Sequence, residues 1–189
     1  MRPINTRTLL LNEAEKLLRT QGYAAFSYAD LAAKVKIRKA SIHHHFPTKE
    51  DLGVAVIDAY LEEFAHELDR LTNSSADTPT KLLAYGDFFS ASLRDGMMPL
   101  CGALAADAVE LPSSMQRRVK RFFQLHLEWL QLIISEGIRA RELKSEPSAS
   151  RSALTLLSTL QGASIVAWAL KDASNVKATY KHVLETIIR

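Results

Sequence analysis

The sequence predicts an all-α protein. Apolar residues recur at helical spacing along most of the chain, and no stretch of useful length alternates apolar and polar residues as a strand does. Seven glycines and six prolines among 189 residues are few for a fold that depends on many turns. With 47% hydrophobic and 24% charged residues, the composition is that of a globular protein with a substantial core. We therefore expect about nine helices.

Three helices are expected within the first fifty residues. The first has one apolar face, formed by Leu10, Ala14, Leu17 and Leu18. Gly22 stands where a helix C-terminus favours glycine, and we expect it to end this helix. Ser27 and Asp30 have the spacing of a capping box and begin a short second helix. A third short helix over about residues 39–46 follows a tight turn, and Pro47 ends it.

Six further helices are expected beyond residue 47. Thr48 and Asp51 repeat the capping-box spacing at the start of a long fourth helix, and Ser113 and Gln116 have it at the start of a long seventh helix. The other helices are expected over residues 81–93, 100–109 and 172–188, with one more beginning at Pro147.

The basic residues are concentrated near the N-terminus. The whole chain has a net charge of +3, but residues 1–50 hold nine basic and four acidic residues, a net charge of +5. The remaining 139 residues therefore carry a net charge of −2. A basic head on a nearly neutral body indicates that the head meets a polyanion.

Cys101 is the one cysteine in the sequence. A disulfide within the chain and a cysteine-based zinc site are therefore excluded, and a reduced, cytoplasmic setting is expected. The N-terminus has no apolar segment followed by a small-residue cleavage site, so we expect no signal peptide.

Residues 152–170 contain no charged side chain. This length could cross a membrane, but six of these residues are polar, so we expect no membrane span but a helix buried on both sides. One face would pack within the subunit, and the other would join the apolar stripe of the next helix in a homodimer interface. The residues expected in that interface are Leu157, Gln161, Ile165, Tyr180, Val183, Leu184 and Ile187.

The second and third helices, joined by a tight turn at Lys36 and Ile37, form a candidate helix-turn-helix. In this motif the first residues of the second helix reach base edges in the major groove. Arginine and lysine supply phosphate or guanine contacts there, and small residues let the backbone approach closely. Helix N-termini also attract phosphate, which adds residues at the starts of the second and fourth helices. The expected DNA contacts are Ser27, Tyr28, Arg38, Lys39, Ala40, Ser41, His43, His44 and Lys49.

Over the same residues the sequence resembles the tetracycline-repressor (TetR) family of bacterial regulators. The resemblance is carried by Gly22-Tyr23, by FSYADLA at residues 26–32 and by IRKASIHHHFPTKEDL at residues 37–52. It covers about the first quarter of the chain. The resemblance implies a DNA-binding domain over residues 1–50 and a ligand-binding and dimerisation domain over residues 51–189. It further implies a repressor that a small molecule releases from its operator, with double-stranded DNA of near-palindromic sequence as the partner.

Three positions depart from the family pattern. Lys36 stands in the turn where the family often has glycine, and Arg38 stands where a serine or threonine would cap the third helix. His43 replaces a common tyrosine. Adjacent residues on a helix point about 100° apart, so His43, His44 and His45 are not expected to form a metal site. We expect His45 to pack on the core and the other two to face DNA.

Aromatic and sulfur-containing residues are concentrated in the middle of the C-terminal region. Such a set fits either a plain core or an apolar ligand pocket with few polar groups, and the family resemblance favours the pocket. His126 and Gln161 are the best candidates for polar groups inside it, although His126 also fits a core histidine with satisfied hydrogen bonds. The expected pocket residues are Phe64, Phe89, Cys101, Leu104, Phe122, His126, Trp129, Gln161 and Trp168.

Cys101 has three possible roles: pocket lining, inert core filling and chemical sensing. A position near the start of a predicted helix favours the thiolate, but no basic residue is adjacent in sequence. A repressor that senses oxidants or electrophiles through Cys101 is therefore an alternative hypothesis.

These observations favour a cytoplasmic, dimeric, ligand-responsive DNA-binding repressor without a cofactor. The effector is not identified by the sequence. An all-helical enzyme is a remote alternative, because the sequence contains no nucleophile–base motif, metal-ligand spacing or phosphate loop. A helical adaptor that binds another protein is also remote, because the basic head fits DNA better.

Overall fold

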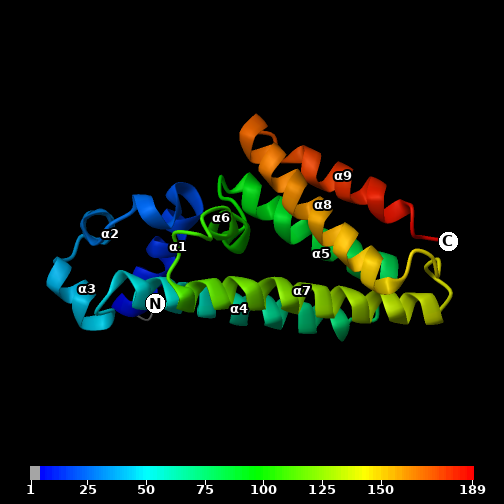
Figure 1. Ribbon diagram of the computed structural model, residues 1–189, viewed down its shortest axis with the longest axis horizontal. Coiled ribbons are helices and arrows are strands. Elements are labelled where there is room, and N and C mark those ends of the chain that lie inside the picture. Colours follow the sequence, from blue (N-terminus) through cyan, green and yellow to red (C-terminus); the bar gives the residue numbers. More distant parts are fainter. Residues whose placement is uncertain (1–4) are drawn as a thin grey trace. The chain divides into compact units, whose positions relative to one another are not determined.

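The structure is a computed structural model that describes residues 5–189, and in this range the chain forms nine α-helices (Figure 1). The helices are α1 Thr6–Ala25, α2 Tyr28–Val35, α3 Lys39–His45, α4 Lys49–Thr72, α5 Thr78–Arg94, α6 Leu100–Ala106, α7 Ser113–Arg139, α8 Ala149–Leu170 and α9 Ser174–Glu185. A single antiparallel bridge joins Leu143 and Ile188. The all-α prediction is confirmed.

The helices form two compact units. The first contains residues 5–62 and Leu100–Arg121, and the second contains Glu63–Pro99 and Phe122–Arg189. Helices α4 and α7 therefore each contribute residues to both units. The functional boundary expected after residue 50 stays a prediction.

The first unit is built around α1, which packs against α2 and α6. The apolar face predicted for α1 lies in the core, with Leu10, Leu17 and Leu18 at most 1% exposed. Gly22 breaks the helical geometry with φ 80° and ψ 171°, and α1 resumes for one short turn beyond it. The positive φ favours glycine at this position, and the Asp107 carboxylate, 2.6 Å from where a Cβ would lie, would also have to move to admit a side chain.

Two capping boxes form as predicted. The Asp30 carboxylate accepts from the Ser27 amide at 2.7 Å, and the Ser27 hydroxyl accepts from the Asp30 amide at 3.4 Å. Thr48 and Asp51 repeat this arrangement at the start of α4, with both amide bonds at 3.0 Å. Caps of this kind stabilise a helix by about 1 kcal/mol each, and here they set the starts of the two helices that flank α3.

Several helix bounds differ from the prediction: α5 begins at Thr78, α6 ends at Ala106 and α9 spans Ser174–Glu185. The caps of two further helices also differ. Ser113 is already the first residue of α7, and Gln116 donates its side-chain amide to the Leu111 carbonyl at 2.8 Å instead of completing a capping box. The helix expected from Pro147 begins at Ala149, because Ser148 is the capping residue and accepts from the Arg151 amide.

In the second unit α5, α8 and α9 pack together, and α8 and α9 lie side by side (Figure 1). Tyr180 of α9 is 2% exposed and donates its hydroxyl to the Leu82 carbonyl of α5 at 3.0 Å. A Cβ on Gly86 would lie 2.5 Å from the Tyr180 ring, so glycine lets this ring lie directly on the α5 backbone. The apolar stripe of α9 is thereby used inside the subunit.

Candidate functional site

The turn between α2 and α3 has the geometry of a helix-turn-helix. α2 ends at Val35, and the C-cap residue Lys36 has left-handed backbone angles, φ 58° and ψ 42°. The Ile37 amide donates to the Ala32 carbonyl at 3.2 Å and closes the turn. Arg38 then becomes extended and precedes α3 without making a side-chain cap. The structure confirms the tight turn at residues 36–37, with a lysine where glycine would be relaxed.

We expect the Lys36→Gly variant to be more stable than the wild type by about 1 kcal/mol. A left-handed conformation costs a side-chain-bearing residue roughly 1–2 kcal/mol, and glycine's greater freedom in the unfolded chain offsets part of the gain. Urea denaturation of the two proteins measures the difference. A Lys34→Gly variant, two residues earlier and inside α2, is the control and should be destabilised. Equal or lower stability of Lys36→Gly would contradict the strain at this turn.

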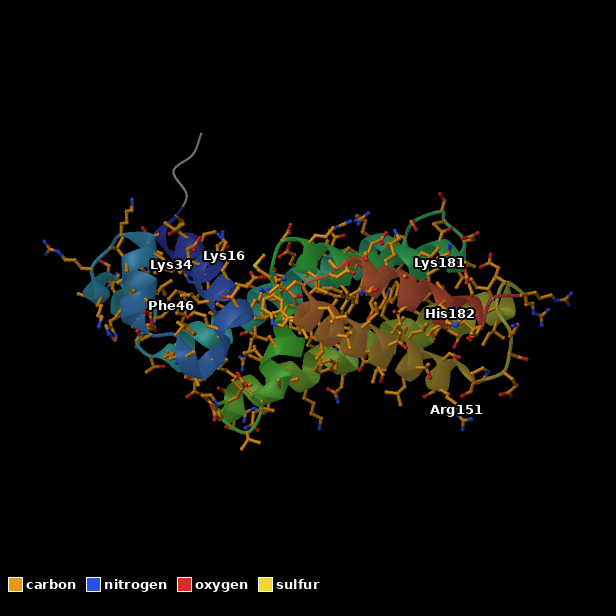
Figure 2. All side chains as sticks on the ribbon, turned by 90° about the horizontal axis from the view of Figure 1, so that it is seen from above. Lys16, Lys34, Phe46, Arg151, Lys181 and His182 are labelled. Carbon is orange, nitrogen blue, oxygen red and sulfur yellow. The ribbon has the colours of Figure 1, made fainter. Side chains whose placement is uncertain are left out.

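Helix α3 turns one side toward the core and leaves the other exposed. Ile42 is 0% exposed, and Phe46, which follows the helix, is 3% exposed beneath the Arg7 guanidinium at 5.2 Å. His45 is half-buried, as expected for a residue against the core. The predicted contact residues at the start of α3 and its two outward histidines are all exposed: Arg38, Lys39, Ala40, Ser41, His43 and His44. Figure 2 shows the side chains of this unit, with Lys16, Lys34 and Phe46 labelled.

Tyr28 and His43 hold the two helices in register. The Tyr28 hydroxyl lies 2.9 Å from the Phe46 carbonyl and 2.5 Å from the Thr48 carbonyl, and it can donate to either. Desolvation, with a smaller contribution from Asp51, raises the pKa of Tyr28 to about 12. His43 packs edge-on against the Tyr28 ring at 4.9 Å, and its Nδ1 contacts the Pro47 carbonyl at 3.0 Å. The hydroxyl of Tyr28 is therefore committed to the fold, whereas Nε2 of His43 stays available.

Lys49 was expected to reach a phosphate from the start of α4, but its ammonium group is held within the unit. It lies over the Tyr23 ring at 4.5 Å and the Phe26 ring at 4.7 Å, and it contacts the Ala24 carbonyl at 3.5 Å. Desolvation lowers the pKa of Lys49, against the opposing effect of Asp30. The spacing of aromatic residues and lysine in sequence did not reveal this contact, since it joins residues 23–26 to residue 49.

The first unit contains further basic residues that lie beyond residue 50. The sequence prediction of a basic head covered only residues 1–50 and therefore left them out. The first turns of α7 carry Arg117, Arg118, Lys120 and Arg121, and the compact unit formed with α1 to α3 includes them. Arg118 pairs with Asp58 of α4 at 2.6 Å, which fixes α7 beside α4 in this unit. The run of four cations within five residues was visible in the sequence, but its place in the fold was not.

Aromatic side chains of the second unit gather around His126. Phe64 stacks on the His126 ring at 4.3 Å and meets Phe122 at 5.5 Å. Tyr85 stacks on Trp129 at 5.1 Å and contacts Phe89 at 5.6 Å. Five predicted pocket residues, Phe64, Phe89, Phe122, His126 and Trp129, therefore share one cluster, which we call the His126 cluster together with Tyr85.

Two nitrogen atoms of predicted pocket residues are buried without a hydrogen-bond partner. The Tyr85 hydroxyl and Nδ1 of His126 are 2.5 Å apart, but Nε2 of His126 has no partner among the described residues. Nε2 of Gln161 on α8 is in the same condition. Trp129, by contrast, donates its indole N–H to Thr72 at 2.8 Å and is satisfied by the fold. Buried polar atoms without partners are rare, so these two mark places where a bound molecule can make a hydrogen bond.

The burial of His126 predicts a loss of stability in mild acid. Desolvation lowers the pKa of this fully buried imidazole to about 3. The unfolded chain binds a proton below about pH 6.5 and the folded chain does not, so stability present above pH 6.5 is lost as the pH falls toward 3. Between pH 7 and pH 5 this loss is about 2 kcal/mol. Urea denaturation at both pH values should show that the His126→Gln variant loses about 2 kcal/mol less than the wild type. An equal loss in both proteins would contradict the prediction.

The other predicted pocket residues lie elsewhere. Cys101 and Leu104 are on α6 in the first unit, and both are 0% exposed. Burial raises the pKa of the Cys101 thiol, which disfavours the reactive thiolate and argues against the redox-sensing alternative. Trp168 lies near the end of α8 and is 40% exposed, whereas the residues of the His126 cluster are at most 8% exposed.

The residues predicted for a dimer interface are divided between the core and the surface. Four of them pack inside the subunit at 6% exposure or less: Leu157, Tyr180, Leu184 and Ile187. Val183 and Gln161 are half-buried, and Ile165 is 58% exposed. Leu154 and Val166 of α8 are also more than half exposed. The apolar surface that a partner could cover is therefore on α8, whereas the exposed side of α9 carries polar residues such as Lys181 and His182 (Figure 2).

The fold and the exposed start of α3 define a DNA-binding protein of the helix-turn-helix class. Residues 10–56 match the model of the family described as "Bacterial regulatory proteins, tetR family". Crystal structures of TetR-family regulators match nearly the whole chain. One from Agrobacterium tumefaciens has 31% identity and a TM-score of 0.92, with 97% of each chain covered. One from Legionella pneumophila has 32% identity and a TM-score of 0.90, with 99% of this chain and 100% of that one covered.

Characterised relatives agree with these structures. The HTH-type transcriptional repressor DhaR of Mycobacterium sp. (strain GP1) is 21% identical over 159 residues, which cover 83% of this chain and 79% of DhaR. The HTH-type transcriptional regulator CymR of Pseudomonas putida is 28% identical over 148 residues, 72% of this chain and 70% of CymR. The chain therefore belongs to the TetR family. It is a DNA-binding transcriptional regulator and not an enzyme.

Membership of this family also accounts for α8. By length and composition alone, α8 is the one helix within residues 5–189 that could cross a membrane. The same helix is part of a fold that matches crystal structures of TetR-family regulators over almost its entire length. α8 is therefore a helix of this fold, and its buried face packs against α5 and α9.

Proposed function

We propose that this regulator is a cytoplasmic homodimer that represses transcription from a near-palindromic operator and is released from it by a small molecule. The exposed apolar face of α8 is the observation that carries the proposal. A symmetric pair of helix-turn-helix motifs reads two half-sites, and a dimer needs a surface on which the copies meet. The naming of the relative DhaR as a repressor supports repression in this chain.

The DNA contacts are proposed to come from the exposed start of α3. Lys39 and Ser41 are placed to reach base edges or phosphates, and Ala40 leaves room for the backbone to approach. Ser27 caps α2, and the N-terminus of this helix can donate backbone N–H hydrogen bonds to a phosphate. His43 and His44 extend the contact along the outer side of α3. Tyr28 and Lys49 support this surface from within, so we assign them to positioning and not to direct contact.

The dimer is proposed to form on α8. Leu154, Ile165 and Val166 are 56%, 58% and 53% exposed, and they lie on one side of the helix together with Gly162, which has open space around it. Large apolar side chains gathered on one exposed helix face are typical of an interaction site. Glycine at the centre of this face lets a second helix approach closely.

The effector is proposed to bind at the His126 cluster. The cluster offers aromatic walls and a neutral imidazole whose Nε2 has no partner, and the low pKa of His126 keeps this group uncharged at physiological pH. These properties fit a largely apolar, uncharged molecule with one hydrogen-bonding group. Release requires that the effector bind the DNA-free state more tightly than the DNA-bound state. Helix α4 begins beside α3 and contains Phe64 of the cluster, so a shift of α4 could transmit this difference.

Replacing Ile165 by lysine should convert the dimer into a folded monomer. A charge on the exposed α8 face must be desolvated in the dimer but stays solvated in the monomer. Sedimentation velocity should show the wild type as a dimer at micromolar concentration and the Ile165→Lys variant as a monomer. Operator affinity of the variant should fall by about 100-fold or more because one head binds alone.

Val109→Lys is the matched control, since Val109 is 97% exposed and lies outside α8. It should stay dimeric and bind the operator as the wild type does. A dimeric Ile165→Lys variant would contradict the assignment of the interface to α8.

A further inference from the structure

A half-open pocket of about 520 Å³ lies at the end of α8 in the second unit. Its walls come from the end of α5, the last turn of α8 and the residues that lead into α9. The residues that matter for its chemistry are Leu93, Arg94, Ala167, Trp168, Lys171 and Asp172. None of them belongs to the His126 cluster. The volume is within the range of about 300–1,000 Å³ that small-molecule sites occupy.

One part of this pocket is apolar. Leu93 and Ala167 form buried walls at 9% and 2% exposure. Trp168 is 40% exposed, which leaves part of a large aromatic ring in water beside them. A planar ring that stacks on this indole would remove apolar surface of both partners from water. The pocket therefore favours a flat, largely apolar ligand.

The other part of the pocket is cationic. Arg94 and Lys171 are exposed, and neither forms an ion pair within residues 5–189. Asp172 is the acidic residue of the wall, but its carboxylate is already engaged. It accepts from the Ser174 amide at 3.0 Å, the Ser174 hydroxyl at 2.6 Å and the Asn175 side chain at 3.0 Å, and these bonds lower its pKa. Asp172 therefore stays ionised but is held by its own neighbours, and the two cations give this rim a net charge of +1.

The backbone holds Lys171 at this rim in an unusual conformation. Lys171 ends α8 with φ 54° and ψ 36°, the left-handed region that favours glycine. The Lys171 amide donates to the Trp168 carbonyl, and the Asp172 amide donates to the Ala167 carbonyl, so the last turn is closed by backbone bonds alone. The lysine side chain is not needed to end the helix. Its presence at a glycine position brings a cation to the pocket.

We propose that this pocket is a second ligand site, separate from the DNA-binding surface and the His126 cluster, and that it binds an aromatic carboxylate. The ring stacks on Trp168 above Leu93 and Ala167. The carboxylate accepts hydrogen bonds from the Arg94 guanidinium and the Lys171 ammonium, which are the two donors at the rim. An uncharged aromatic molecule of the same shape lacks the second interaction and binds more weakly.

Calorimetric titration of the full chain with 2-naphthoate, and with 2-naphthamide as its neutral counterpart, tests the site. The naphthoate should bind and the amide should bind at least 10-fold more weakly. Arg94→Gln should weaken naphthoate binding by about 10- to 100-fold, the range expected for a lost charge-assisted hydrogen bond. Arg139→Gln is the matched control, because Arg139 is also an exposed arginine in the last turn of a helix of this unit, and it should not change the affinity.

Lys171→Gly separates a binding defect from a folding defect. This variant removes the rim cation and relaxes the left-handed residue, so its melting temperature should rise while its naphthoate affinity falls by 5-fold or more. Equal binding of naphthoate and naphthamide, an Arg94→Gln affinity equal to that of Arg139→Gln, or no binding at millimolar naphthoate would each overturn the proposal. Binding that survives Arg94→Gln but is lost in His126→Gln would place the anion at the His126 cluster and overturn it as well.

Discussion

The Ala40→Glu variant is expected to lose about 100-fold or more in operator affinity while it stays folded and dimeric. Ala40 is the second residue of α3 and is exposed, with the cations of Arg38 and Lys39 just before it. A carboxylate at this position would face the phosphates and base edges of DNA. It would repel the phosphate groups and keep α3 farther from the groove. The loss of one good base contact is worth about 1–3 kcal/mol, and charge repulsion adds to it.

Fluorescence anisotropy with labelled operator DNA measures this loss. Ala140→Glu is the matched control, since it makes the same chemical change at another exposed alanine, in the turn after α7. The control should bind the operator with wild-type affinity. An Ala40→Glu protein that binds as tightly as the control would show that α3 does not carry the DNA contact.

The Phe122→Ala variant is expected to lower the free energy of unfolding by about 3–5 kcal/mol, the usual cost of removing a buried phenylalanine ring. Phe122 is 1% exposed and contacts the Phe64 ring at 5.5 Å and the His126 ring at 4.0 Å. Its removal leaves a cavity that rigid aromatic neighbours cannot readily fill. Because the His126 cluster is also the proposed effector site, the variant should respond poorly to any effector that releases the wild type.

Chemical denaturation of Phe122→Ala beside Phe123→Ala provides the comparison. Phe123 is the next residue on α7 and is half-buried, so its truncation removes less contact and should have about half the effect or less. Equal losses for the two variants would show that the cluster around His126 is not a tightly packed core.

The features predicted correctly from the sequence are local. Each capping box, at Ser27 and at Thr48, involves residues three apart. The break at Gly22 depends on the backbone conformation of one residue. Short sequence patterns are therefore enough to predict these features. The turn at Lys36 was also predictable, including the strain of a lysine at a glycine position. Hydrophobic spacing was enough to give nine helices, because the period of an amphipathic helix is short.

The features that were missed depend on packing between distant segments. Lys49 was placed at a helix start with a free ammonium group, but the rings of Tyr23 and Phe26 hold it. Tyr180 and Leu184 have the spacing of an interface stripe, yet Tyr180 bonds to α5 of the same subunit and Leu184 is 0% exposed within it. An apolar stripe in sequence shows that a face is covered and does not show what covers it. Cys101 likewise could be classified only once its burial was known.

Salt dependence of operator binding tests the central claim most directly. A site selected from a random DNA pool by the full-length protein supplies the operator, and its affinity is then measured from low to high potassium chloride concentration. A dimeric helix-turn-helix regulator with several phosphate contacts per head should select a near-palindromic site. The logarithm of its affinity should fall with the logarithm of salt concentration with a slope of about −4 or steeper. A nearly flat dependence, or a selected pool without symmetric half-sites, would contradict binding by two basic recognition heads.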